Sequence, residues 1–159
     1  MVTIREDDLT GPEIAGLLRA HLDHSAALSP PESVHALDLE RLRAPGITFW
    51  SAWVDGELVG CAALQELAPG HGEIKSMHTA ELHRGKGVAS RLVGHILEVA
   101  RSRSYRRVSL ETGSMEGFAP ARALYARFGF RLCPPFAPYR EDPHSVFMTL
   151  ELDHSGSTR

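Results

Sequence analysis

Apolar residues recur at steps of three and four positions in several parts of this chain, which is the period of an amphipathic helix. The first such stretch has Pro12 in its opening turn and ends before Pro30, so the pattern predicts a helix between these prolines. The same period predicts further helices over 33–43, 87–103 and 120–128. The helix over 87–103 has the broadest apolar stripe and basic residues in its last turn, which complement the helix dipole.

Short runs rich in β-branched and aromatic residues alternate with these helices. They predict strands over 2–5, 47–54, 58–64, 71–79, 108–112 and 146–152. Asp55–Gly56 supplies the positive φ angles of a tight hairpin turn between two of them. Hairpins in the first half of the chain and strand–helix crossovers in the second half predict a mixed sheet with helices on both faces, and therefore an α/β domain.

The composition excludes several classes of protein. A length of 159 residues suits one domain, which we expect to span 1–152, with the polar stretch 153–159 as a flexible tail. A net charge of −3 argues against broad electrostatic binding to nucleic acid or an anionic membrane. No stretch approaches the ~18 apolar residues of a membrane span, and the first residues lack the apolar core of a signal peptide. We therefore expect a cytoplasmic protein.

Cysteine and histidine spacing gives no indication of a metal site. Cys61 and Cys133 form no C-x-x-C pair, which argues against a disulfide framework and against a structural zinc site. His21/His24 and His78/His83 have no accompanying ligands at the spacing of a tetrahedral site. We therefore expect no bound metal.

A glycine-rich turn, Arg84–Ala89, lies between the predicted strand 71–79 and the predicted helix 87–103. Gly85 and Gly87 let the backbone approach a ligand closely, and free N–H groups together with the helix dipole favour an anion at this place. Arg84 and Lys86 add positive charge. The turn is thus a candidate pyrophosphate site, and the alternative is a solvated basic turn that caps the helix.

Two motifs in this chain resemble those of the GNAT superfamily of acetyl-CoA-dependent N-acetyltransferases. Arg84, Gly87 and Ala89 match the family signature Gln/Arg-x-x-Gly-x-Gly/Ala, and the stretch 121–130 (ARALYARFGF) is similar to its A-x-x-L-Y-x-x-x-G-F segment. The resemblance spans residues 2 to about 152. One position departs from the pattern, because Phe118 stands where many members carry an asparagine that contacts the pantetheine arm.

The resemblance implies a single GNAT-like α/β domain whose central, twisted mixed sheet has about seven strands and about four flanking helices. It implies that the fourth and fifth strands splay apart, and that Met77 and Thr79 offer backbone groups to the thioester and pantetheine arm of acetyl-CoA. The backbone of the turn would hold the pyrophosphate through Arg84, Gly85, Lys86, Gly87, Val88 and Ala89.

The resemblance also assigns the catalytic groups. Tyr125 matches the general acid that protonates the departing thiolate, with packing of its ring at the edge of the core as the alternative. The backbone N–H of Met77 is the candidate oxyanion donor. Glu73 matches a general base in the histone-modifying branch, or else it forms an ion pair with Lys75 on a solvated face. Glu111 is a rival base or binds the cationic amine.

The acceptor is the open question. His35 and His78 are candidates to line its cleft, and the proline-rich stretch 133–142 (CPPFAPYRED) either shapes that cleft or is a plain connector. We predict acetyl transfer to a primary amine of a small molecule by direct attack in a ternary complex. The alternatives are acetylation of a protein or peptide amine, and binding of acetyl-CoA without turnover. The oligomeric state stays open, and a homodimer is compatible because many members of the family are dimers.

Overall fold

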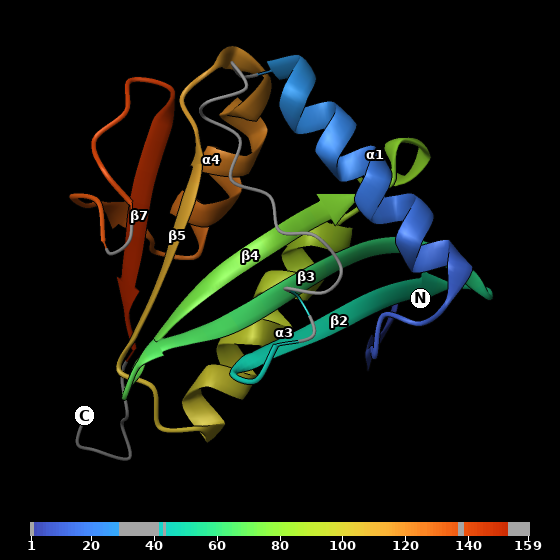
Figure 1. Cartoon of the computed structure of the whole chain (residues 1–159), viewed down its shortest axis with the longest axis horizontal. Helices are drawn as coiled ribbons and strands as arrows, with labels where there is room; N and C mark the ends of the chain where they lie inside the picture. The colour runs from blue at the N-terminus through green and yellow to red at the C-terminus, as the bar shows by residue number, and fades with distance from the viewer. Residues whose placement is uncertain (1, 29–41, 43, 137–138, 153–159) are drawn as a thin grey trace.

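The computed structural model describes residues 2–28, 42, 44–136 and 139–152 (Figure 1). Seven strands form one sheet in the order β1-β2-β3-β4-β5-β7-β6. The strands are β1 (Thr3–Glu6), β2 (Ile47–Val54), β3 (Glu57–Ala68), β4 (His71–Thr79), β5 (Arg107–Gly113), β6 (Arg131–Leu132) and β7 (Ser145–Glu151). The helices are α1 (Pro12–Leu28), α3 (Val88–Ser102) and α4 (Ala119–Arg127), with 3-10 turns η2 (Glu81–His83) and η3 (Glu116–Phe118).

The predicted α/β domain with a mixed sheet is confirmed. Only β4 and β5 pair in parallel, and all other neighbours in the sheet are antiparallel. The predicted strand 58–64 is longer than expected and runs to Ala68, because it pairs along its length with both β2 and β4. The predicted helix 33–43 lies outside the described residues apart from the buried Leu42, as do His35 and the segment 153–159.

Two apolar clusters cover the two faces of the sheet. The larger one lies under α3, whose buried residues are Val88, Leu92, Val93, Ile96, Leu97 and Ala100. The smaller one lies under α1, whose Ile14 and Leu18 contact the face formed by Phe49, Cys61 and Ala63. Both helices lie against β3 and β4, so the two middle strands are covered on both sides (Figure 1).

The strands β4 and β5 pair over only four positions, from His71↔Arg107 to Ile74↔Leu110. Beyond this point the backbones of the two strands diverge in a V that widens toward their carboxyl ends, and this divergence is called the opening (Figure 1). A β-bulge lies on β4 at the start of the opening, because Cys61 and Ala63 of β3 pair with His78 and Lys75. Ser76, inside the bulge, has a φ of 57°. The splay implied by the sequence resemblance is therefore present.

The paired strands β4, β5 and β7 differ in character between their two faces. Ile74, Val108 and Met148 point into the apolar cluster under α3 and α4. The opposite face is polar, and a hydrogen-bonded chain crosses all three strands on it: His71 Nε2 to Ser109 Oγ at 2.8 Å, and Ser109 Oγ to Thr149 Oγ1 at 2.9 Å. Such a face needs internal partners, because it lies inside the protein.

Gly72 of β4 allows a test of how tightly side chains pack against this part of the sheet. A Cβ atom at this position would lie 2.7 Å from the Tyr105 ring and 2.9 Å from Leu64 Cδ1. We therefore expect Gly72→Ala to lower the free energy of unfolding by about 1–3 kcal/mol in urea denaturation.

The matched control is Gly94→Ala in α3, where the nearest atom, in Phe128, is 4.0 Å from the added Cβ. This change should raise the stability by up to about 1 kcal/mol, because alanine favours the helix over glycine. Equal stabilities of the two variants would contradict the close approach at Gly72.

Candidate active site

A groove with a volume of about 660 Å³ lies between the end of β4, the turn before α3, and the segment η3–α4. It brings together residues that are far apart in the sequence, because Met77 and Thr79 line it from β4 and Tyr125 lines it from α4. Of the remaining predicted site residues, it is lined by His78, Arg84, Gly85, Gly87, Val88 and Ala89. Lys86 does not line this groove, but a neighbouring hollow of about 600 Å³ that it shares with Gly87 and Arg91.

The turn before α3 has the backbone that its glycines predict. Gly85 and Gly87 have φ angles of 78° and 85°, and Gly87 is the N-cap residue of α3 without a side-chain cap. A Cβ atom added at either glycine would meet nothing within 4 Å, so open space lies beside the turn. Arg84 Nε donates to the carbonyl of Thr79 at 3.3 Å and ties the turn to the end of β4. This cradle suits an anionic group at the first turn of α3.

Tyr125 is buried, with 5% of its surface exposed, and still lines the groove. Its ring packs edge-on against Phe130 at 5.7 Å between centroids. Burial raises the pKa of its phenol, so the group is protonated at neutral pH. Within the described part of the chain, no hydrogen bond to the Tyr125 hydroxyl is present.

Phe118, at the position where the family often carries asparagine, also lines the groove. Its ring lies directly against Gly113 at the end of β5, and a Cβ atom at Gly113 would overlap it. Arg122 of α4 donates from Nη1 to the carbonyls of Gly113 at 2.7 Å and Met115 at 3.0 Å. The wall of the groove opposite β4 is therefore an aromatic surface that is held to the end of β5.

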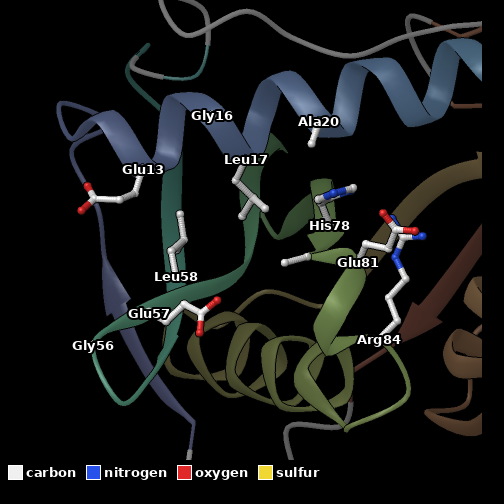
Figure 2. A pocket seen from close by; sticks show the side chains of 11 residues that line it. Glu13, Gly16, Leu17, Ala20, Gly56, Glu57, Leu58, His78, Glu81 and Arg84 are labelled. Carbon is white, nitrogen blue, oxygen red and sulfur yellow. The ribbon is translucent and has the colours of Figure 1, made fainter.

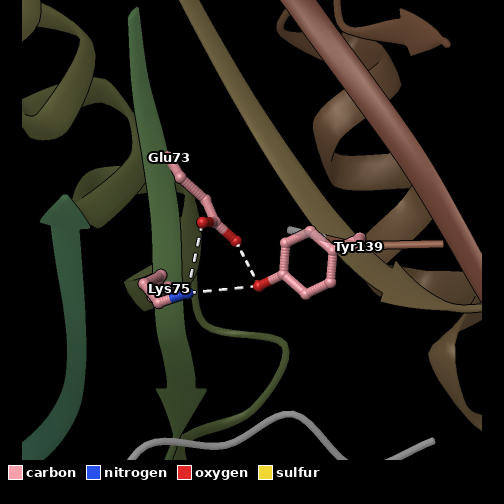
Figure 3. A network of polar contacts seen from close by, with 3 residues as sticks. All are labelled: Glu73, Lys75 and Tyr139. Atoms are coloured by element: carbon pink, nitrogen blue, oxygen red, sulfur yellow. Dashed lines mark hydrogen bonds and ion pairs between the residues drawn. The ribbon is translucent and has the colours of Figure 1, made fainter. Parts of the chain in front are cut away.

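On the polar face of the sheet, Glu73, Lys75 and Tyr139 form a closed set of contacts (Figure 3). The Tyr139 hydroxyl donates to Glu73 Oε2 at 2.6 Å, and Lys75 Nζ donates to Glu73 Oε1 at 3.2 Å and to the Tyr139 oxygen at 3.1 Å. The ion pair that the sequence suggests does form, but the expectation of a solvated face is wrong, because the side chains of Glu73 and Lys75 are only 2% and 11% exposed.

Tyr139 is the residue that the sequence reasoning missed at this site. It belongs to the proline-rich stretch 133–142, and nothing in the spacing of that stretch indicates a partner on β4. In the structure, Tyr139 packs against Phe136 and Phe147 at 5.3 Å and 5.5 Å between ring centroids. The stretch is therefore more than a connector, because it places a phenol on Glu73.

Glu111 lies on the same face, at the first position of β5 beyond the pairing with β4. Its Oε2 accepts a hydrogen bond from Ser145 Oγ at 2.7 Å. Burial raises the pKa of this carboxyl to about 7, the Ser145 bond opposes the rise, and the charge of Glu73 adds to it. A carboxyl that titrates near neutral pH suits proton transfer at that pH.

A second hollow, of about 680 Å³, lies between α1 and the carboxyl end of β4 (Figure 2). Gly16, Leu17 and Ala20 of α1 form one wall, and His78 points toward that wall from β4. His78 and Arg84 line both this hollow and the groove on the other side of β4. Glu13, Glu57 and Glu81 also line the hollow, and the Glu13 carboxylate is directed away from His78 (Figure 2).

The described residues contain no group of three or more His, Cys, Asp or Glu side chains placed to hold a metal ion. Cys61 is buried, and burial raises the pKa of its thiol, which makes it a poor nucleophile. None of the described helices is both long and apolar enough to cross a membrane.

Comparison with known proteins identifies the class. The profile of the acetyltransferase (GNAT) family matches residues 13–130. The chain belongs to the GNAT family of acetyltransferases and is an acyltransferase, as the two sequence motifs indicated.

The similarity to individual relatives extends over nearly the whole chain. It is 58% identical over 149 residues to the uncharacterized N-acetyltransferase YsnE of Bacillus subtilis, with 94% of this chain and 99% of that protein covered. It is 36% identical to an IAA acetyltransferase of Azospirillum brasilense, with 95% and 98% covered. A GNAT family acetyltransferase from Elizabethkingia anophelis, solved with acetyl-CoA bound, shares the fold at a TM-score of 0.70 and 21% identity, with 95% and 98% covered.

Proposed function

We propose that the protein transfers an acetyl group from acetyl-CoA to a primary amine of a small molecule, by direct attack within a ternary complex. The observation that carries this proposal is the single groove that contains the glycine turn, the end of β4 and Tyr125. The glycine turn suits an anionic group of the ligand. Tyr125 supplies an acid for the reacting group.

Acetyl-CoA would lie along this groove. The backbone from Arg84 to Ala89 would hold the pyrophosphate, with Lys86 at the rim of the neighbouring hollow. Met77 and Thr79, beyond the last residue of β4 that pairs with β5, would offer backbone groups to the pantetheine arm. The thioester would then lie beside the β-bulge, between the groove and the polar face of the sheet.

The chemistry needs a neutral amine, an oxyanion donor and an acid. Glu73 or Glu111, directly or through water, would take a proton from the acceptor ammonium. The Met77 amide would donate to the oxyanion, and Tyr125, which is protonated and lines the groove, would protonate the departing thiolate. His78 lines both the groove and the hollow under α1, which suits an acceptor that reaches the thioester from the α1 side.

The volume of the hollow under α1, about 680 Å³, is in the range of small-molecule pockets and supports a small acceptor over a protein or peptide. The acidic residues Glu57 and Glu81 on its walls favour a cationic amine. His35, which lies outside the described residues, remains a candidate for the acceptor side. We propose no nucleic acid or membrane partner, and the cytoplasmic location and the homodimer remain predictions.

The deciding experiment measures thiol release from acetyl-CoA with a panel of small amines, a lysine peptide and IAA, beside calorimetric titration of acetyl-CoA. IAA is included because a relative 36% identical is named for its acetylation. We expect binding of acetyl-CoA and turnover on a small amine. Turnover on the peptide alone would favour the protein acceptor, and binding without any turnover would favour the non-catalytic alternative.

Tyr125→Phe tests the acid. We expect kcat to fall by about 100-fold, because protonation of the thiolate loses its donor, while the Kd of acetyl-CoA stays unchanged. Tyr105→Phe removes another buried phenol, outside the groove, and should keep the wild-type rate. A wild-type rate in Tyr125→Phe would show that the ring only packs.

Gly87→Val tests the pyrophosphate cradle against a matched control. Gly87 and Gly46 have φ angles of 85° and 89°, and an added Cβ meets nothing within 4 Å at either position, so valine strains both backbones similarly. Only Gly87→Val should raise the Kd of acetyl-CoA, by about tenfold or more, because displaced amides lose hydrogen bonds to phosphate. Equal Kd values in calorimetry for both variants and the wild type would contradict the binding of pyrophosphate by this turn.

A further inference from the structure

The two candidate bases differ in their position relative to the opening between β4 and β5. Glu73 pairs with Ser109 inside the parallel ladder, whereas the ladder ends at Ile74↔Leu110 and Glu111 is the next residue of β5. Since Glu111 lies two residues beyond Ser109, it is nearer the open end by about 7 Å along the strand. It is therefore Glu111 that stands at the mouth of the opening, toward Met77.

Glu73 is also fully engaged by the protein itself. One of its oxygens accepts the Tyr139 hydroxyl at 2.6 Å and the other accepts Lys75 Nζ at 3.2 Å, while the residue is 2% exposed (Figure 3). Hydrogen bonds to an ionised acceptor are the strong ones, and 2.6 Å lies at the short end of their range. Because so little of Glu73 is exposed, an amine that used it as its base would have to move the side chains that cover it.

Tyr139 is held in place as a donor to Glu73. Its ring lies among Phe136 and Phe147, and Lys75 Nζ is 5.7 Å from the ring centroid. Burial and the negative charge of Glu73 raise the pKa of the Tyr139 phenol, so it keeps its proton. Its oxygen accepts from Lys75 at 3.1 Å, and its proton is directed at Glu73.

We propose that Tyr139 is a positioning residue that, together with Lys75, holds Glu73 as a fixed and non-reacting anion, and that Glu111 is the catalytic residue that takes the proton of the acceptor amine. This assignment rests on the proposed acetyl transfer and decides between the two bases that it leaves open. Glu73 acts on the reaction only through its charge, which faces Glu111.

The step balances with the groups present. One proton moves from the acceptor ammonium to a Glu111 oxygen, and the freed electron pair forms the C–N bond to the acetyl carbon. The C–S bond breaks, the thiolate takes the Tyr125 proton, and the second proton of the amine returns to Tyr125 through water. Glu111 releases its proton to solvent, so each turnover yields an amide, a thiol and one proton.

The charges around Glu111 set the direction of each mutational effect. Glu73 and Lys75 face it from β4, Asp142 and Tyr139 face it from the segment before β7, and Ser145 bonds it from β7. Removing the Glu73 charge lowers the pKa of Glu111, because like charges disfavour ionisation. Removing the Tyr139 hydroxyl leaves the Glu73 charge less compensated and raises the pKa of Glu111.

The test is the pH profile of kcat/KM for the wild type and three variants, on an amine that the wild type acetylates. We expect the wild-type profile to rise with a midpoint near pH 7, the pKa of Glu111. Glu111→Gln should remove this midpoint and lower kcat/KM by about 100-fold. Glu73→Gln should stay active with the midpoint at lower pH, and Tyr139→Phe, which keeps the ring, should move it to higher pH, each by roughly half a unit or more.

The matched control is Glu66→Gln, an exposed glutamate of β3, for which no shift is expected. Loss of the rising limb in Glu73→Gln with its retention in Glu111→Gln would overturn the assignment, and an unchanged midpoint in Tyr139→Phe would remove the role of Tyr139.

A second readout is independent of turnover. Carbon-13 NMR of the glutamate carboxyls should show one group that titrates near pH 7, is absent in Glu111→Gln, and shifts in the same directions in Glu73→Gln and Tyr139→Phe. Failure of the wild type to acetylate any amine would overturn the proposed function and the catalytic role of Glu111 with it. An NMR titration without these shifts would instead overturn the network itself, whatever the turnover.

Discussion

The short parallel ladder between β4 and β5 is the constraint on which the rest of this structure depends. Four residue pairs join the strands, and a β-bulge at Ser76 then turns β4 away from its neighbour. Backbone groups of β4 beyond Ile74 therefore have no strand partner on the β5 side. Buried backbone polar groups require partners, so an opened ladder is a place where an extended ligand is accommodated. The bulge and the Met77–Thr79 end of the groove lie at this opening, and Glu111 is the first residue of β5 beyond the ladder.

On the polar face of β4, β5 and β7, buried charged side chains next to the opening are paired with partners from the protein. A buried ion pair is weak evidence for stability, because desolvation offsets much of its attraction. Here every polar side-chain atom buried among the described residues has a partner, and the loop after β6 contributes Tyr139 as one of them. The Tyr139 ring, which covers the Glu73–Lys75 pair, packs against the rings of Phe136 and Phe147. Phe136 and Phe147 also contact each other, so aromatic packing holds this cover in place. Stability is therefore a weak explanation for this buried cluster.

His78 connects the two sides of the candidate site. It is 6% exposed and follows the bulge, so its side chain faces α1 while the same stretch of β4 lines the cofactor groove. A donor and an acceptor that approach from opposite sides of the sheet would meet at this point. The family model matches residues on both sides of this point, in the groove and along α1.

Features that depend on local chemistry could be predicted from the amino-acid sequence. Periodicity located α3 to within one residue at each end, Asp55–Gly56 located the hairpin turn, and the glycines of 84–89 predicted the cradle with its positive φ angles. Two short motifs were sufficient for the family. Three features became visible once the chain was folded: Tyr139 bonds Glu73 across 66 positions, the Glu73–Lys75 pair is buried, and Glu111 is the first residue of β5 beyond the ladder. Burial and long-range contacts depend on which segments, distant in the sequence, pack against each other. A local pattern of residues does not specify that packing.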